Sequence, residues 1–188
     1  EILVRRQGCP LDADRLDRLY TATEGWPAAV QLLCLALRDN PDPERLLEQL
    51  IEGGHGIREY LAENVLNALE PDMVEFLSDI SVVEKVCASL ATALSGVTDA
   101  QQLLEQAEQR ELFLHRVDDD PEWFRIQPLF AEHLRARLEH TRPGRVKALH
   151  RRASRWYAEH QLLRKSVDEA LAATDLKMAL DLLESGGM

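Results

Sequence analysis

The chain has 188 residues with 33 acids and 22 bases, for a formal net charge of −11. This length and a hydrophobic content of 45% suffice for one large or two to three small folded domains, and they exclude a disordered or fibrous chain. No apolar run approaches the roughly 20 residues that cross a bilayer, and no basic-then-apolar leader follows Glu1. We therefore expect a cytoplasmic protein without membrane contact, of which this chain is one part.

Residues 1–55 are predicted to be the helical tail of a larger module. Three helices are expected, over residues 11–23, 28–38 and 44–51. Gly25 ends the first helix, and Pro27 begins the second at a first-turn position where a missing N–H costs nothing. The run Gly-Gly-His-Gly at 53–56 favours neither helix nor strand, so we place a hinge and a domain boundary there.

Residues 56–142 are predicted to form a winged helix domain. Four helices are expected first, over residues 57–69, 71–80, 86–94 and 98–111. The last of them starts with Thr98 and Gln101 at the spacing of a capping box. Two strand-like runs around the acidic turn 118–121 then predict a β-hairpin, and Pro128 begins another helix. Helices followed by a hairpin are typical of a winged helix, with the hairpin as the wing.

Residues 143–188 are predicted to be the first helices of a superhelical array similar to tetratricopeptide (TPR) repeats. Three short helices are expected, over 145–160, 162–173 and 176–185. The residues predicted to face inward are Val146, Leu149, Ala153, Trp156 and Tyr157, then Val167, Ala170 and Leu171, then Met178, Ala179, Leu182 and Leu183. Because three helices cannot bury both of their faces, we expect the array to continue past Met188. The predicted fold class is therefore mostly α.

Charge is unevenly distributed along the chain. Residues 1–130 carry 25 acids and 11 bases, whereas residues 131–188 carry 8 acids and 11 bases. The stretch from Arg135 to Arg155 holds eight Arg and Lys residues against Glu139 alone. Three interpretations are open: a solvated face of two helices, a seam that pairs with the acidic body, or a nucleic-acid contact. The lack of interleaved aromatic residues for base stacking disfavours the last.

Five stretches carry a resemblance to a known family: TEGWPAAVQL at 23–32, YLAENVL at 60–66, RELFL at 110–114, FRIQPLF at 124–130 and LHRRASRWY at 149–157. They occur in the family's order over nearly the whole chain. On these residues the chain resembles the MalT-like, LuxR-type, ATP-dependent transcriptional regulators, which look like STAND-type signalling NTPases.

The resemblance implies the regulatory middle segment of such an activator, which couples nucleotide state and inducer sensing to DNA binding. Its partners would be the rest of its own chain, meaning a P-loop core and a helical-repeat sensor, and an inducer molecule or protein. Self-association is a further possibility. DNA would be bound only by a C-terminal helix-turn-helix outside this sequence, and ATP or ADP by the longer protein. The alternative is a stand-alone winged-helix and helical-repeat module that docks a protein partner.

The resemblance also implies two nucleotide-binding positions. In related NTPases a Gly-x-Pro turn packs against adenine, which would place Gly25, Trp26 and Pro27 at that site; the other interpretation is a helix–helix turn with Trp26 in the core. Related NTPases contact the β-phosphate of ADP with a winged-helix histidine, where this chain has Gln127. Glutamine donates a hydrogen bond but supplies no positive charge, so either the ADP contact is weaker or another residue makes it.

Catalytic and metal-binding signatures are missing from the sequence. It contains no Gly-x-x-x-x-Gly-Lys-Ser/Thr phosphate loop and no Gly-x-Ser-x-Gly elbow. The three cysteines, Cys9, Cys34 and Cys87, are too widely spaced for a zinc site or a disulfide framework. We expect no enzymatic activity from this segment, no metal, and a slow signalling ATPase only in the longer protein.

Overall fold

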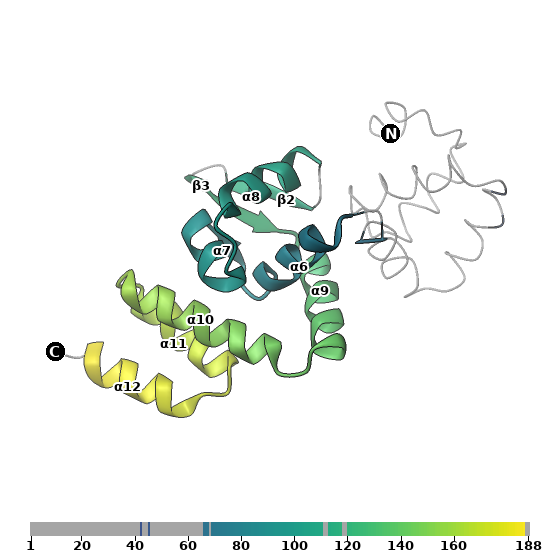
Figure 1. The fold of residues 1–188 in the computed structure, drawn as a ribbon. Coiled ribbons are helices and arrows are strands. Elements are labelled where there is room, and N and C mark those ends of the chain that lie inside the picture. The colour runs from purple at the N-terminus through teal and green to yellow at the C-terminus, as the bar shows by residue number, and fades with distance from the viewer. Residues whose placement is uncertain are drawn as a thin grey trace, which may run out of the picture. The chain divides into compact units, whose positions relative to one another are not determined.

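The computed structural model describes residues 42, 45, 66–67, 69–110, 113–117 and 120–186, most of which are drawn as a coloured ribbon in Figure 1. The chain divides into two compact units, residues 1–69 and residues 70–188. The glycine-rich hinge at 53–56 lies outside the described residues, as do nearly all residues of the helices predicted before residue 66. The domain boundaries predicted after residues 55 and 142 stay predictions.

Within its described residues, the second unit contains seven helices and one three-stranded sheet. In chain order the elements are α6 (Pro71–Ile80), β1 (Lys85–Val86), α7 (Ala88–Ser95), α8 (Ala100–Gln109), β2 (Leu114–Val117), β3 (Asp120–Ile126), α9 (Pro128–Thr141), α10 (Arg145–Glu159), α11 (Leu163–Ala172) and α12 (Leu176–Gly186). None of the described helices is long and apolar enough to cross a membrane.

Elements α6 to β3 form a winged helix. The sheet is antiparallel with strand order β1-β3-β2, and the hairpin of β2 and β3 is the wing. Arg116 pairs with Phe124, and the register shifts between Arg116 and Val117 as the strands approach the tip. The prediction of a mostly α fold with a winged helix and a short hairpin is confirmed.

Helix α6, predicted over residues 71–80, buries one face. Met73, Phe76, Leu77 and Ile80 are buried, at the i, i+3, i+4 and i+7 spacing of one helix face. Pro71 occupies the first turn of α6, where its missing N–H needs no partner. This face joins Leu90 and Leu94 of α7, Leu104 of α8 and Phe124 of β3 in one core, which holds the winged helix together.

Two local predictions in the winged helix are wrong. Val86 does not begin a helix; with Lys85 it forms strand β1, and α7 begins at Ala88. Thr98 does not cap α8, because the N-cap residue is Asp99 and no side chain bonds the free N–H groups. The Asp99 backbone, at φ −95° and ψ 31°, departs from the extended conformation in which an N-cap side chain reaches the first turn.

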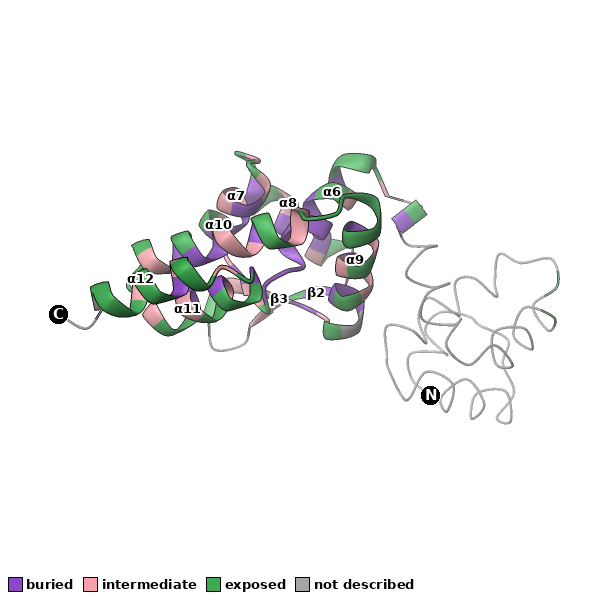
Figure 2. Ribbon diagram, turned by 90° about the horizontal axis from the view of Figure 1, so that it is seen from below, coloured by how far each residue is buried: buried purple, intermediate pink, exposed green. Residues whose placement is uncertain are grey.

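Helices α10, α11 and α12 pack in sequence against one another (Figures 1 and 2). Of the inward positions predicted for α10, Leu149, Ala153, Trp156 and Tyr157 are buried, whereas Val146 is half-buried. Leu171 and Leu183 are instead 48% and 53% exposed. The buried positions of α11 and the turn after it are Ser166, Ala170 and Ala173, which lie on a face that Leu171 does not share.

Candidate functional site

The predicted nucleotide residues fall in different parts of the structure. Gly25, Trp26 and Pro27 lie outside the described residues. Gln127 is half-buried at the junction of β3 and α9, as the N-cap residue of α9. Its backbone N–H donates to Phe113 O at 2.8 Å and its carbonyl accepts from Ala131 N at 3.0 Å. These bonds fix Gln127 beside the positive end of a 14-residue helix, a setting suited to an anion.

Sequence reasoning did not find Arg125, which lies two positions before Gln127 on β3. Gln127 follows the last residue of β3 with an extended backbone, so the alternation of the strand continues to it and places its side chain on the same side as Arg125. Arg125 Nη2 donates to Glu84 Oε1 at 2.6 Å. The signal in the sequence was the alternation in Trp-Phe-Arg-Ile-Gln, which places Trp123, Arg125 and Gln127 together opposite Phe124 and Ile126.

The surface of α8, the helix that reads base edges in DNA-binding winged helices, is committed to an ionic network. Arg116 of β2 donates through Nε to Glu108 Oε2 at 2.9 Å and through Nη2 to Glu105 Oε1 at 3.4 Å. The hydrogen bond to Glu108 raises the pKa of Arg116. Among the described residues, Arg116 is the only base that the wing brings to α8, and Glu105 and Glu108 neutralise it. The acidic surface of α8 repels a phosphate backbone.

The basic stretch 135–155 largely forms an ionic seam. Arg142 Nη1 lies 2.5 Å from Glu75 Oε1, and this contact lowers the pKa of Glu75. Arg145 makes a bidentate contact with Asp79, at 3.0 Å from Nε and 2.5 Å from Nη2. The Asp79 side chain is only 1% exposed, whereas that of Arg145 is 27% exposed. Of the three interpretations left open for this stretch, these two pairs support the seam with the acidic body.

Two further arginines reach the ends of helices in the winged helix. Arg135 donates to Ser81 O at 3.1 Å, at the C-terminus of α6. Arg152 donates to Leu94 O at 2.6 Å, in the last turn of α7. A cation at a helix C-terminus complements the helix dipole. The seam therefore joins α9 and α10 to α6 and α7 by both charge pairing and carbonyl contacts.

Aromatic side chains join the wing to α10. Trp123 of β3 packs edge-on against Trp156, with ring centroids 6.1 Å apart, and Trp156 contacts Tyr157 at 5.3 Å. Lys165 Nζ lies 5.4 Å from the Trp123 ring. Trp156 and Tyr157 are 7% and 3% exposed, so their predicted role in core packing is confirmed.

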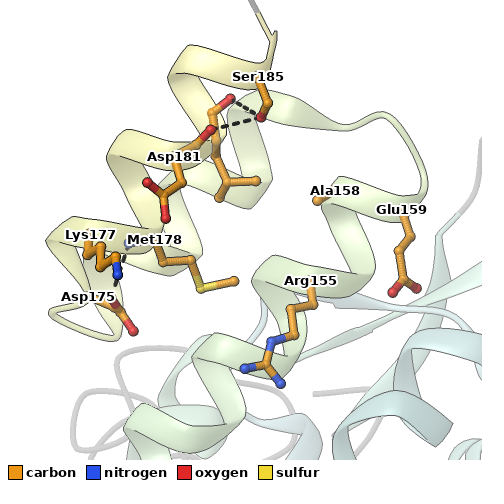
Figure 3. A pocket seen from close by; sticks show the side chains of 9 residues that line it. Arg155, Ala158, Glu159, Asp175, Lys177, Met178, Asp181 and Ser185 are labelled. Atoms are coloured by element: carbon orange, nitrogen blue, oxygen red, sulfur yellow. Dashed lines mark hydrogen bonds between the residues drawn. The ribbon is translucent and has the colours of Figure 1, made fainter.

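A groove of about 510 Å³ lies between α10 and α12 (Figure 3). Its lining mixes both signs of charge with a few apolar groups: Arg155, Ala158, Glu159, Asp175, Lys177, Met178, Asp181, Leu182 and Ser185. Asp175 has a structural role, because it accepts hydrogen bonds from Met178 N and from Arg151 Nε. These bonds lower the pKa of Asp175. The groove contains none of the predicted nucleotide residues. The described residues contain no group of acids, histidines and cysteines able to hold a metal ion.

Comparison with known proteins defines the class as a winged helix of MalT type. Residues 62–146 match the family model described as the MalT winged helix domain. The chain is 48% identical over 177 residues to the serine/threonine-protein kinase PknK of Mycobacterium tuberculosis, an alignment that covers 94% of this chain and 16% of the relative. It is 33% identical to the HTH-type transcriptional regulators MalT of Serratia proteamaculans (93% of this chain, 20% of the relative) and Yersinia enterocolitica (95% and 20%).

The chain is thus MalT-like, with a MalT-type winged helix at residues 62–146. It spans a fifth or less of the length of these curated relatives.

Proposed function

We propose that this chain is the regulatory middle segment of an ATP-dependent LuxR-type transcriptional activator, coupling nucleotide state and inducer sensing to output domains elsewhere in the protein. ADP contacts at Gly25, Trp26, Pro27 and Gln127 would hold the resting state, and ATP with inducer would release it. In this proposal the protein is cytoplasmic and the complete chain is a slow ATPase. Residues 1–55, 56–142 and 143–188 are the tail of the NTPase module, the winged helix and the first TPR-like helices.

The observation that carries the proposal is the surface of α8. Glu105 and Glu108 hold Arg116 where a DNA-reading winged helix would need free donors and positive charge. This favours a winged helix that binds within its own protein and leaves DNA to another domain.

The relatives support a coupling role in a second way. The same segment occurs in proteins named as a kinase and as transcriptional regulators, and it is a small part of each. A role common to both is the regulation of an attached output domain. Because one relative is a kinase, the type of output domain in this protein stays open. The seam at Glu75 and Asp79 supplies a physical link by which a change at the winged helix reaches α10.

Hydrogen–deuterium exchange on the natural protein that contains this chain tests the proposal. We expect exchange in residues 145–186 to differ between the ADP and ATP complexes. Arg145→Gln should shrink that difference, because it removes the contact with Asp79, while nucleotide affinity stays unchanged. Arg164→Gln, which changes an exposed base on α11, is the matched control. Identical exchange in both nucleotides would contradict coupling.

A second candidate is a protein-interaction module, favoured by apolar exposure on the last helices. Leu176, Leu180 and Leu183 share one face of α12 and are 67%, 59% and 53% exposed. In this case Leu180→Asp should abolish partner binding or self-association, and nucleotide should have no effect on either. Sedimentation of the chain with and without ADP separates the two candidates.

A further inference from the structure

Three basic side chains form a row across the outer face of the sheet. The antiparallel register sets Lys85 of β1 opposite Arg125 of β3, and Arg125 opposite His115 of β2. Residues directly opposite in neighbouring strands project from the same face, so the three side chains lie side by side. Their neighbours along the strands point the other way and are buried: Val86, Leu114, Phe124 and Ile126.

The row brings the positive charges of Lys85 and Arg125 close together. Side chains directly opposite in adjacent strands have Cβ atoms about 5 Å apart, and like charges at that distance destabilise a sheet. Among the described residues, the acidic contact of Arg125 is Glu84, whose side chain is 76% exposed. One surface carboxylate compensates for only part of the charge on Lys85 and Arg125.

The guanidinium of Arg125 is also incompletely hydrogen-bonded. Nη2 is bonded to Glu84, but the buried Nε has no acceptor among the residues that the structure describes. A buried N–H without an acceptor carries a desolvation cost. The side chain as a whole is 40% exposed, so an incoming phosphate would contact the guanidinium at its Nη groups, where charge-assisted hydrogen bonds are strong.

We propose that Lys85, Arg125 and His115 form a subsite for the diphosphate of a nucleotide, next to Gln127, which directly follows β3. This inference rests on the proposed nucleotide-dependent function and extends it. Arg125 supplies the positive charge that Gln127 lacks, Lys85 adds a second cation, and His115 contributes an imidazole N–H. In the free protein Glu84 acts as an internal competitor, which the incoming phosphate displaces from Arg125.

The site fits a diphosphate better than a protein carboxylate. Its cations come from three adjacent strands, so they span a row about 10 Å wide, which exceeds the reach of one carboxylate. A short anion with oxygens along its length contacts all three side chains. The wing end of the same sheet face, at Trp123, is covered by Trp156 of α10, whereas His115 on β2 is exposed.

Isothermal titration of the 188-residue chain with pyrophosphate, ADP and adenosine at low ionic strength tests the subsite. Pyrophosphate and ADP should bind. Arg125→Gln should weaken pyrophosphate about tenfold, a loss of roughly 1.4 kcal/mol, and Lys85→Gln or His115→Gln about threefold. Glu84→Gln should strengthen binding about threefold, because the competing carboxylate is gone. Lys147→Gln, an exposed base on α10, is the matched control and should change nothing.

The Glu84 variant separates a binding role from a structural one. If the Arg125–Glu84 pair only stabilises the sheet, both Arg125→Gln and Glu84→Gln lower the melting temperature, and neither strengthens pyrophosphate binding. Arg125→Lys, which keeps the charge without the planar edge, should bind with intermediate affinity and covers the case in which Arg125→Gln fails to fold.

Failure of the subsite and failure of the nucleotide function give different results. No pyrophosphate binding, or equal weakening by Lys147→Gln, overturns the subsite. ADP binding that is unaffected by Arg125→Gln also overturns it and leaves the nucleotide function standing. Pyrophosphate binding that depends on Arg125 supports the subsite. If the longer natural protein then has no affinity for ADP, that lack of affinity counts against the nucleotide function alone.

Discussion

The contact between Asp79 and Arg145 is asymmetric in burial, and this sets how each residue responds to mutation. Arg145 is the first residue of α10, where a cation opposes the helix dipole, so the carboxylate of Asp79 must offset an unfavourable position. The hydrogen bonds to Asp79 raise the pKa of Arg145. Asp79 is enclosed while Arg145 reaches solvent, so Asp79 depends on the pair more than Arg145 does.

Arg145→Ala should therefore destabilise the protein more than Asp79→Ala. Removing Arg145 leaves a buried carboxylate unpaired and should cost roughly 3–5 kcal/mol of the free energy of unfolding. Removing Asp79 leaves a guanidinium that turns into water and should cost about 1.5–3 kcal/mol. Urea denaturation followed by circular dichroism measures both values. Arg110→Ala breaks the exposed pair with Glu70 and is the control, with little expected effect on stability. The reverse order of the two main variants would contradict this account.

The burial of the Tyr157 phenol leads us to expect a loss of stability at alkaline pH. Burial raises the pKa of Tyr157 well above its usual value, and the nearby Glu169 adds to the effect. A phenol whose pKa is higher in the folded state contributes stability that is complete below the unfolded pKa of about 10 and is lost as pH rises above it. We expect the free energy of unfolding to fall above about pH 10, and Tyr157→Phe to flatten part of that fall. An unchanged pH profile in the variant would show that other groups cause the loss.

At the scale of elements, the crossing of α10 and α11 is fixed by two serines. Ser154 Oγ donates to Ser166 O and Ser166 Oγ donates to Ser154 O, each at 2.8 Å, and both residues are 0% exposed. The two backbones can approach closely here, because a serine is nearly as small as alanine and each hydroxyl bonds the facing carbonyl. They also set the register of one helix against the other.

Ser154→Ala and Ser166→Ala should each cost about 1 kcal/mol of stability, the usual net value of a hydrogen bond. The double variant should cost less than the sum, because each hydroxyl also lies 3.3 Å from the other. A double-mutant cycle by thermal denaturation measures this coupling. Ser185→Ala, on the exposed side of α12, should have little effect and serves as the control. Strict additivity of the two main variants would mean that the bonds act independently.

The sequence predicts elements well where periodicity is long and breakers are clear. Helices α9 to α12 lie within a few residues of their predicted bounds because Pro128, Gly144 and the apolar repeats mark them. Strand β1 was missed because its two residues carry no periodic pattern, and only pairing with β3 makes them a strand. Leu171 was misjudged because a leucine next to a buried position satisfies a loose helical pattern on either face.

The candidate site is harder to read from the sequence than the fold. The charge distribution allows a seam as one of three interpretations, yet it does not indicate that Asp79 would be the buried partner of a residue 66 positions away. Gln127 came from a family resemblance, whereas the bases beside it are brought together by strand register. Lys85 is 40 positions from Arg125, and no local motif connects the two.

At the scale of the whole chain, the structure has two compact units, and the described contacts of the second explain why it holds together. The winged helix and α10 are linked by the seam, by the donation from Arg152 to Leu94 and by the contact of Trp123 with Trp156. Of these contacts, Arg145 with Asp79, Arg152 with Leu94 and Trp123 with Trp156 join residues on opposite sides of the boundary predicted after residue 142. Elements linked by buried ion pairs and aromatic packing unfold together unless those contacts are weak.

We therefore expect residues 70–188, expressed alone, to unfold in a single transition. The calorimetric and van't Hoff enthalpies should agree, and the transition should have the same midpoint by tryptophan fluorescence, which reports Trp123 and Trp156, as by circular dichroism. Arg145→Ala combined with Arg152→Ala should separate the probes, because α10 to α12 would then unfold before the winged helix. Arg164→Ala with Lys177→Ala, two exposed bases on α11 and α12, is the charge-matched control and should leave one transition. Two transitions in the unmodified segment would mean that the boundary after residue 142 separates independent domains and that the seam is a surface contact with little energetic weight.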